Sequence, residues 1–272
     1  LKRKPKVLNT HGSLLGYKKY LPSSQHTPYQ LYDALTLKAS AKSADAVVVS
    51  SKLEYEDAIE FGIQKTKLHV IPMGVDVDEY VNNPINPSGD SINILFVGRI
   101  ARVRRIEILL QAVTKLSIPF HVTLVGGEEK TSSLSRSGYL DELKKLCKDL
   151  NINNRVTFVG PVAQNELFNW YSEGDIFVYP SLYENFGQPI LEAAAAGLPI
   201  VSAPVGVAQE IITDNETGFL FNGDDQELAN RITQLTDQNL RKKIGGAVRE
   251  RVRSLYGWEG IIKQYLDLYR SL

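Results

Sequence analysis

Two glutamates flank the predicted start of a helix, where their side chains could bind hydroxyl groups of a ligand. Glu184 and Glu192 have seven residues between them, among them Pro189. Proline is tolerated at the first helical position because its missing N–H would have no partner there, so we expect the helix to begin at Gln188 or Pro189. The amides of a helix start favour an anion, and carboxylates accept paired hydrogen bonds from neighbouring hydroxyls. The simpler alternative is that both carboxylates only stabilise the positive end of the helix dipole.

Residues 175–221 predict a strand, a polar loop, a helix and a second strand. The runs at 175–179 and 198–202 are apolar and of strand length, and the helix between them contains the small residues Ala193–Ala196. Gly187 allows close backbone approach at the mouth of this helix. We therefore expect the helix start to point out of the sheet, toward a ligand cleft.

A basic loop follows another predicted strand. The segment FVGRIARVRR at 96–105 places Gly98 and Arg99 at the carboxyl end of that strand. Ligands bind at this edge of an open α/β sheet, and guanidinium groups suit phosphate oxygens. Arg99 and Arg104 could therefore face one anion, although a solvated basic turn is the plainer interpretation.

The whole string around the glutamates resembles a known signature. ENFGQPILEAAAAGLPIV, followed by GVAQEII and ETGFLF, is similar to the donor-binding region of retaining glycosyltransferases of family 4, which have the two-domain GT-B fold. The resemblance implies that Glu184 contacts hydroxyls of the donor sugar at the reaction centre and that Glu192 accepts hydrogen bonds from the ribose. It also implies that the backbone of Phe186, Gly187 and Gln188 reaches the sugar and the phosphates.

The same resemblance covers the basic loop and two further positions. The family pattern is Gly-Arg followed a few residues later by Lys-Gly, with Arg and Lys holding the diphosphate. Here Arg104 replaces the lysine and Arg105 replaces the glycine, so Arg102 or Arg105 could share the role. Val162, with its neighbours Gly160 and Pro161, matches the loop whose backbone contacts the base.

His11 ends a predicted strand at residues 6–11 and precedes a glycine. The resemblance implies that it is the first-domain histidine that lies over the reacting sugar. A histidine with a structural role in a loop is the alternative, since one histidine at a strand end is a weak signal.

The order of strands and helices predicts an α/β protein of GT-B type, with two Rossmann-like, doubly wound parallel sheets. The first has only three predicted strands and is incomplete. Residues 73–91 read as a linker, with a domain boundary near residue 88. We expect 1–88 to be the end of an acceptor-side domain, 89–255 to be the nucleotide-sugar domain, and the helix in 256–272 to cross back to the first domain.

Composition narrows the function classes. Lys plus Arg equals Asp plus Glu at 31 each, which gives no reason to expect nucleic acid. A single cysteine, Cys147, fits a reducing compartment, and the chain has neither a long apolar run nor a signal peptide, so we expect a cytoplasmic protein. No His, Cys or carboxylate set has metal-ligand spacing, so we expect neither a metal nor another cofactor.

We therefore predict a metal-independent, retaining glycosyltransferase that moves a hexosyl group from a UDP-, GDP- or ADP-sugar to a carbohydrate or lipid-linked hydroxyl acceptor. The chain begins with leucine, and we expect it to be a fragment that binds the nucleotide but transfers sugar poorly. The absent part of the first domain leaves room for a membrane surface. The alternatives are a GT-B epimerase or phosphorylase and a non-catalytic nucleotide-sugar binding module.

Overall fold

The computed structural model describes residues 4–12, 14–16, 18, 23–81, 91–128 and 138–272. The chain forms two compact units, one made of Leu1–Gly74 with Trp258–Leu272 and the other of Val75–Gly257. The predicted boundary near residue 88 lies outside the described residues, and the first unit already ends at Gly74. The chain returns to the first unit at Trp258, close to the expected position.

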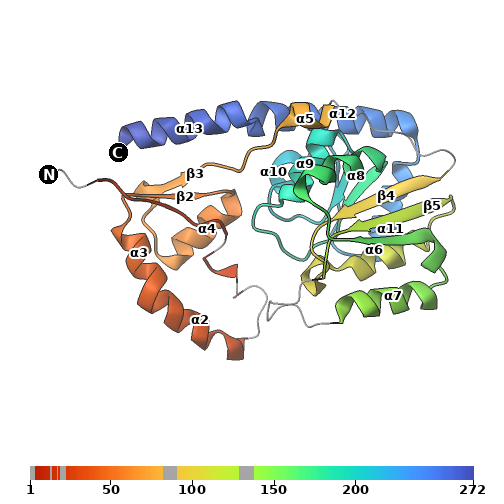
Figure 1. Cartoon of the computed structure of the whole chain (residues 1–272), viewed down its shortest axis with the longest axis horizontal. Coiled ribbons are helices and arrows are strands. Elements are labelled where there is room, and N and C mark those ends of the chain that lie inside the picture. The colour runs from red at the N-terminus through yellow and green to blue at the C-terminus, as the bar shows by residue number, and fades with distance from the viewer. Residues whose placement is uncertain (1–3, 13, 17, 19–22, 82–90, 129–137) are drawn as a thin grey trace. The chain divides into compact units, whose positions relative to one another are not determined.

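The first unit contains a three-stranded parallel sheet in the order β1-β2-β3. Its strands are β1 (Val7–Asn9), β2 (Ala46–Val49) and β3 (Leu68–Val70). The side chains of β2 alternate between two cores: Val47 and Val49 pack in a cluster with Phe61, and Ala46 and Val48 pack with Ile261 and Leu268 of α13 (Trp258–Ser271). The C-terminal helix thus covers one face of this sheet (Figure 1).

The helical segment between Thr27 and Ser43 is interrupted. It consists of α2 (Thr27–Tyr32), a π-helical segment (η2, Asp33–Leu37) and α3 (Lys38–Ser43). The next helix is α4 (Lys52–Phe61). Ser51 caps its start with a side chain that accepts from the Glu54 amide, and Gly62 caps its end in the left-handed conformation. Serine and glycine at these two ends are typical helix caps.

The second unit contains a six-stranded parallel sheet in the order β6-β5-β4-β7-β8-β9. Its strands are β4 (Ile92–Val97), β5 (Phe120–Val125), β6 (Val156–Gly160), β7 (Ile176–Tyr179), β8 (Ile200–Ser202) and β9 (Phe219–Leu220). The runs at 175–179 and 198–202 correctly predict β7 and β8. The chain starts in the middle, runs outward to β6, and then returns to the middle at β7. This is the doubly wound order that the sequence predicts.

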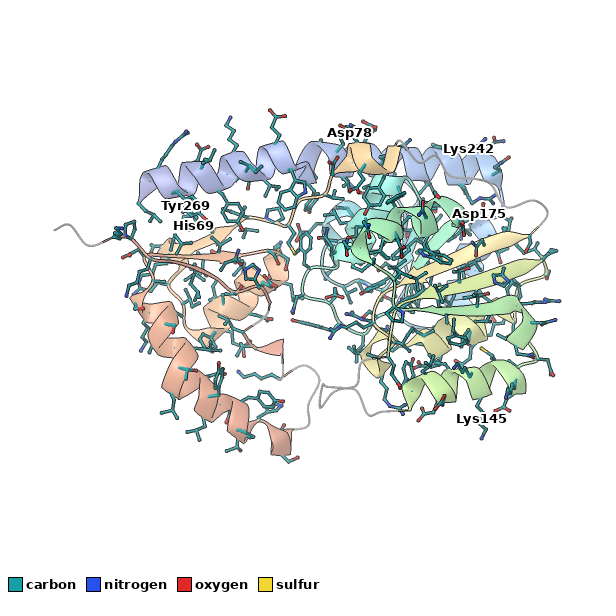
Figure 2. All side chains as sticks on the ribbon, in the orientation of Figure 1. His69, Asp78, Lys145, Asp175, Lys242 and Tyr269 are labelled. Atoms are coloured by element: carbon teal, nitrogen blue, oxygen red, sulfur yellow. The ribbon has the colours of Figure 1, made fainter. Side chains whose placement is uncertain are left out.

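Helices cover both faces of this sheet, with α6 and α7 on one side and α8 and α9 on the other (Figure 1). The helices are α6 (Ile106–Val113), α7 (Tyr139–Asp149), α8 (Leu167–Glu173), α9 (Gln188–Ala196), α10 (Ala208–Ile211), α11 (Asp225–Gln234) and α12 (Gln238–Tyr256). Short 3-10 turns are η1 (Ser23–Gln25), η3 (Lys65–Lys67), η4 (Arg102–Arg104), η5 (Asn153–Arg155) and η6 (Gln164–Glu166). On α7, Leu143 and Cys147 are buried while Lys145 points to solvent (Figure 2).

The short helix α5 (Val77–Val81) was not predicted. The segment read as linker begins with α5, which is capped by Asp76 through the amides of Asp78 and Glu79. Five residues are too short to show helical periodicity, so only the cap could have indicated it. Val75, Val77 and Tyr80 belong to the core of the second unit, which explains why that unit begins earlier than expected.

No helix among the described residues combines the length and the apolar character needed to cross a bilayer.

Helix α9 packs tightly because its neighbour carries glycine at the contact. A Cβ atom added to Gly245 of α12 would lie 1.9 Å from the carbonyl oxygen of Gly197, which ends α9. A Cβ atom at Gly246 would meet nothing within 4 Å. Gly245 therefore allows α12 to support the helix that carries Glu192.

This pair of glycines gives a matched test of the packing. Gly245→Ala should lower the free energy of unfolding by about 1–3 kcal/mol, because backbone must move to admit the methyl group. Gly246→Ala should raise it by about 0.5–1 kcal/mol, since alanine is the better helix former. Urea unfolding followed by circular dichroism measures both, and equal effects of the two substitutions would contradict the packing argument.

Candidate functional site

The two central strands of the second unit, β4 and β7, pair side by side although their connections run in opposite directions. This is the topological switch point of a doubly wound sheet, and open α/β sheets bind their ligands at such a point, outside the carboxyl ends of the strands. Gly98 and Arg99 follow β4, and residues 180–187 follow β7. The residues predicted from two separate motifs therefore meet at one edge of the sheet.

The strand ends at this edge approach closely through glycine. The Gly98 amide donates to the Val125 carbonyl at 2.9 Å, and the Gly126 amide donates to the Gly160 carbonyl at 2.9 Å. A Cβ atom at Gly126, whose φ is +139°, would lie 1.9 Å from the Gly98 carbonyl oxygen. The backbone after β4 and β5 is thus held in one arrangement, and Arg99 extends from it with an exposed side chain.

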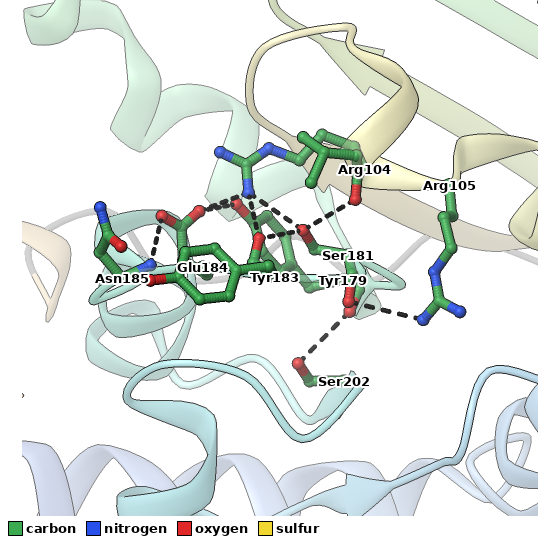
Figure 3. A network of polar contacts seen from close by, with 9 residues as sticks. Arg104, Arg105, Tyr179, Ser181, Tyr183, Glu184, Asn185 and Ser202 are labelled. Atoms are coloured by element: carbon green, nitrogen blue, oxygen red, sulfur yellow. Dashed lines mark hydrogen bonds and ion pairs between the residues drawn. The ribbon is translucent and has the colours of Figure 1, made fainter. Parts of the chain in front are cut away.

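Arg104 and Glu184 form an ion pair at the centre of this edge (Figure 3). Arg104 Nη1 lies 2.5 Å from Glu184 Oε2, and the two side chains are 8% and 17% exposed. The same nitrogen donates to Ser181 Oγ at 3.1 Å and to the Tyr183 carbonyl at 3.2 Å. The structure therefore joins two residues to which the sequence assigns separate roles.

Tyr179, the last residue of β7, contacts both members of this pair. Its hydroxyl donates to Glu184 Oε2 at 2.7 Å, and its ring lies 5.4 Å from the Arg104 guanidinium carbon. Burial raises the pKa of the Tyr179 phenol, and the Glu184 carboxylate adds to this while Arg104 opposes it. The phenol consequently stays protonated and acts as a donor.

The other two arginines considered for the same role point elsewhere. Arg102 is bonded to Glu142 and lies over the Tyr139 ring. Arg105 Nε donates to the Pro180 carbonyl at 2.9 Å, and burial lowers the pKa of this guanidinium. Arg105 has φ +48° and ψ +44°, which is the left-handed conformation that glycine adopts readily. Arg105 thus has the backbone conformation that would suit the glycine of the family pattern.

Helix α9 begins at the same edge. Gly187 caps it with φ +94°, and Gln188 and Pro189 open its first turn, as predicted. The Phe186 ring is buried 6.2 Å from that of Tyr256, and the Phe186 carbonyl accepts from the Val207 amide at 2.6 Å. The Phe186 carbonyl is thus used inside the fold, so the backbone that the helix start offers to an anion consists of amides.

Glu192 lies one turn further along α9 and is 4% exposed. Tyr171 donates to its Oε2 atom at 2.8 Å, and Gln164 donates to its Oε1 atom at 3.3 Å. Burial raises the pKa of this carboxyl group, while hydrogen bonds from Tyr171, Gln164 and Gln188 act in the opposite direction. A carboxylate has about four lone-pair sites, so with these three donors the group can still accept a hydrogen bond from a hydroxyl.

Val162 and His11 complete the set of predicted residues. Val162 follows β6 in the loop that also carries Gln164, and it is half-buried against the core of the second unit. His11 follows β1 in the first unit and has φ +48° with an exposed side chain. The residues predicted to bind the donor thus all belong to the second unit, while His11 belongs to the first.

Three residues of the site were not predicted: Tyr179, Tyr171 and Gln164. Tyr179 ends an otherwise apolar strand, and a residue there with a polar tip could have indicated a contact at the sheet edge. Tyr171 lies in a helix and Gln164 in a loop, and no local pattern connects either of them to Glu192.

The fold and the site together define a GT-B glycosyltransferase scaffold. Glycosyl transferases group 1 matches residues 80–251, and Glycosyltransferase Family 4 matches residues 1–79. The chain therefore belongs to the group 1 glycosyl transferases.

Individual relatives agree with this assignment. A D-inositol 3-phosphate glycosyltransferase from Xylanimonas cellulosilytica is 29% identical over 84% of this chain and 57% of its own length. Sucrose-phosphate synthase from Thermosynechococcus elongatus has a TM-score of 0.80 and 30% identity over 97% of this chain and 67% of that one. HepE from Anabaena, in complex with UDP and glucose, has a TM-score of 0.85 and 23% identity over 98% and 72%. The chain spans 57% of the length of the first of these relatives.

The buried Glu192 predicts a dependence of stability on pH. Because its pKa is raised above the ordinary 4.5, the folded chain binds this proton more tightly than the unfolded chain. The carboxylate therefore destabilises the fold above that raised pKa, and the penalty disappears as the pH falls below 4.5. Glu192→Gln should raise the melting temperature at neutral pH, and the gain should shrink on acidification.

Melting curves of both proteins from neutral to mildly acidic pH measure this difference. Glu142→Gln is the control, because the hydrogen bond from Arg102 lowers the pKa of that exposed carboxyl group and its removal should give no gain. A melting-temperature difference for Glu192→Gln that does not change with pH would contradict the assignment.

Proposed function

We propose that the protein transfers a hexosyl group from a nucleoside diphosphate sugar to a hydroxyl acceptor, with retention of anomeric configuration and without a metal ion. The observation that carries this proposal is the Arg104–Glu184 pair at the switch point, beside the start of α9. Membership of the group 1 glycosyl transferases supports the class of reaction.

In this proposal, the diphosphate lies between the arginine loop and the start of α9. Arg99, Arg104 and the first amides of α9 stabilise the negative charge that grows on the leaving diphosphate. Arg104 is already directed by Ser181 Oγ and the Tyr183 carbonyl, so little reorganisation is needed when the donor binds. This arrangement supplies the positive charge that many transferases obtain from a metal ion.

Glu184 would contact the sugar. Its Oε2 atom accepts from Arg104 and Tyr179, and its Oε1 atom accepts from the Asn185 amide at 3.1 Å. A carboxylate beside a diphosphate would repel it, but the ion pair with Arg104 compensates this charge. Oε1 can accept one more hydrogen bond from a sugar hydroxyl.

Glu192 would hold the ribose, and the loop with Val162 would contact the base. Gln164, in the turn that follows that loop, donates to Glu192, so the base loop and the ribose carboxylate are directly connected. The structure of HepE contains UDP, and that is the reason to test uridine nucleotides first.

Titration calorimetry with UDP, GDP, ADP and their sugars tests the proposal. We expect one nucleoside diphosphate to bind, and we expect turnover of its sugar to require an acceptor alcohol and to give a product with the anomeric configuration of the donor, measured by NMR. Turnover without an acceptor would instead indicate an epimerase, and binding without turnover in any longer form of the protein would indicate a binding module.

The diphosphate role of Arg104 gives a prediction. Arg104→Ala should weaken nucleoside diphosphate binding by about 10- to 100-fold, because a charged hydrogen bond contributes about 1.5–3 kcal/mol. Binding of the bare nucleoside should change little, and Arg104→Lys should retain most of the affinity. Calorimetry measures both ligands, and equal losses for nucleoside and diphosphate would refute the role.

Substitutions of Glu192 and Glu184 should have different effects on nucleotide binding and turnover. Glu192→Gln should weaken binding of the nucleoside and of every nucleotide, because it removes the charge that accepts the ribose hydroxyls. Glu184→Gln should leave nucleoside diphosphate affinity nearly unchanged, because the glutamine carbonyl still accepts the hydrogen bond from Arg104, and should depress kcat. The reverse pattern in titrations and steady-state kinetics would show that the roles are exchanged.

A further inference from the structure

Arg105 has a combination of features that the proposed reaction does not use. It is a long side chain at a left-handed backbone position, with φ +48°. Such positions disfavour residues with a Cβ atom and persist only where the surroundings hold them. The side chain therefore makes contacts that are strong enough to keep this backbone in place.

The side-chain hydrogen bonds of Arg105 go to the loop that follows β7. Arg105 Nε donates to the Pro180 carbonyl at 2.9 Å, and Nη2 lies 3.5 Å from the Ser181 carbonyl (Figure 3). Gly223 makes room for the guanidinium, since a Cβ atom there would lie 2.6 Å from Arg105 Nη1. The guanidinium thus holds the first two residues of the loop after β7.

Two preceding residues hold the next part of the same loop. The Val103 carbonyl accepts from the Leu182 amide at 2.8 Å and from Ser181 Oγ at 3.2 Å. Arg104 then reaches Ser181 Oγ, the Tyr183 carbonyl and Glu184. Three consecutive residues therefore bind residues 180–184 between them, and Arg105 fixes the end of this loop that leaves the strand.

We propose that Arg105 is a positioning residue that fixes the loop 180–184 so that Glu184 and Ser181 can direct Arg104 toward the diphosphate. The inference rests on the proposed function for its effect on ligands. Its effect on the loop is independent of any ligand. Glu192 lies on α9 and is held by Tyr171, Gln164 and Gln188, so the nucleoside side of the site should not depend on Arg105.

The first arm of the test is ligand-free. Arg105→Gly removes the guanidinium and keeps a residue that adopts the left-handed conformation readily, so the fold should survive. Hydrogen exchange should become about tenfold faster at the Leu182 amide and stay unchanged in α9. Unchanged exchange at Leu182, or an equal increase in α9, would overturn the inference whether or not any nucleotide binds.

The second arm uses the nucleoside diphosphate and the nucleoside in parallel titrations. Arg105→Gly should weaken diphosphate binding about five- to tenfold, as expected for the loss of one or two hydrogen bonds, and leave nucleoside binding unchanged. Arg105→Lys should restore part of the affinity. Arg155→Ala is the matched control, because Arg155 lies over the Phe120 ring at the opposite edge of the sheet.

A double substitution decides whether Arg105 acts through its neighbour. In an Arg104→Ala background, Arg105→Gly should cause no further loss of diphosphate affinity. Additive losses, or equal losses for nucleoside and diphosphate, would overturn the inference. If the unchanged chain binds none of the three nucleoside diphosphates, the proposed function fails, and the exchange arm still decides the role of Arg105.

Discussion

The ion pair between Arg104 and Glu184 is the interaction on which the rest of the site depends. With 8% and 17% of the side chains exposed, each charge needs the other, because removal of one partner of a buried pair leaves an uncompensated charge. The two residues lie 80 positions apart in the sequence. Only the pairing of β4 with β7 brings their loops to the same edge of the sheet.

Residues around the Arg104–Glu184 pair hold the pair and its neighbouring helix in place. Tyr179 is protonated and donates to the pair from the end of β7, and Arg105 anchors the loop that carries Glu184. On the other side, Gly245 allows α12 to approach the end of α9. Such short contacts are lost when the elements move by a fraction of an ångström. The site therefore depends on helices and strands whose positions are fixed by the close-packed core.

The sequence predicts the second unit well because its central strands β4, β7 and β8 are almost entirely buried and therefore read as nearly continuous apolar runs. The residues Arg104, Glu184 and Glu192 follow from motifs beside those runs. The partners of Glu192 could not be predicted in this way, because Tyr171 and Gln164 contact it from elements that are distant in the sequence. The π-helical segment at Asp33–Leu37 and the short helix α5 were missed for a local reason. The sequence has no clear signal for a π-helix, and five residues are too few to show helical periodicity.

The surroundings of the two glutamates differ in a way that fits two different ligands. Glu184 is bonded to a guanidinium, and its charge is compensated before any ligand arrives. Glu192 is bonded to a phenol and two amide side chains, which are neutral, and burial raises its pKa. A diphosphate repels any bare carboxylate, whereas a ribose is neutral and donates hydrogen bonds to one. These surroundings are therefore consistent with the proposed roles, in which the compensated carboxylate lies beside the diphosphate and the uncompensated one binds the ribose.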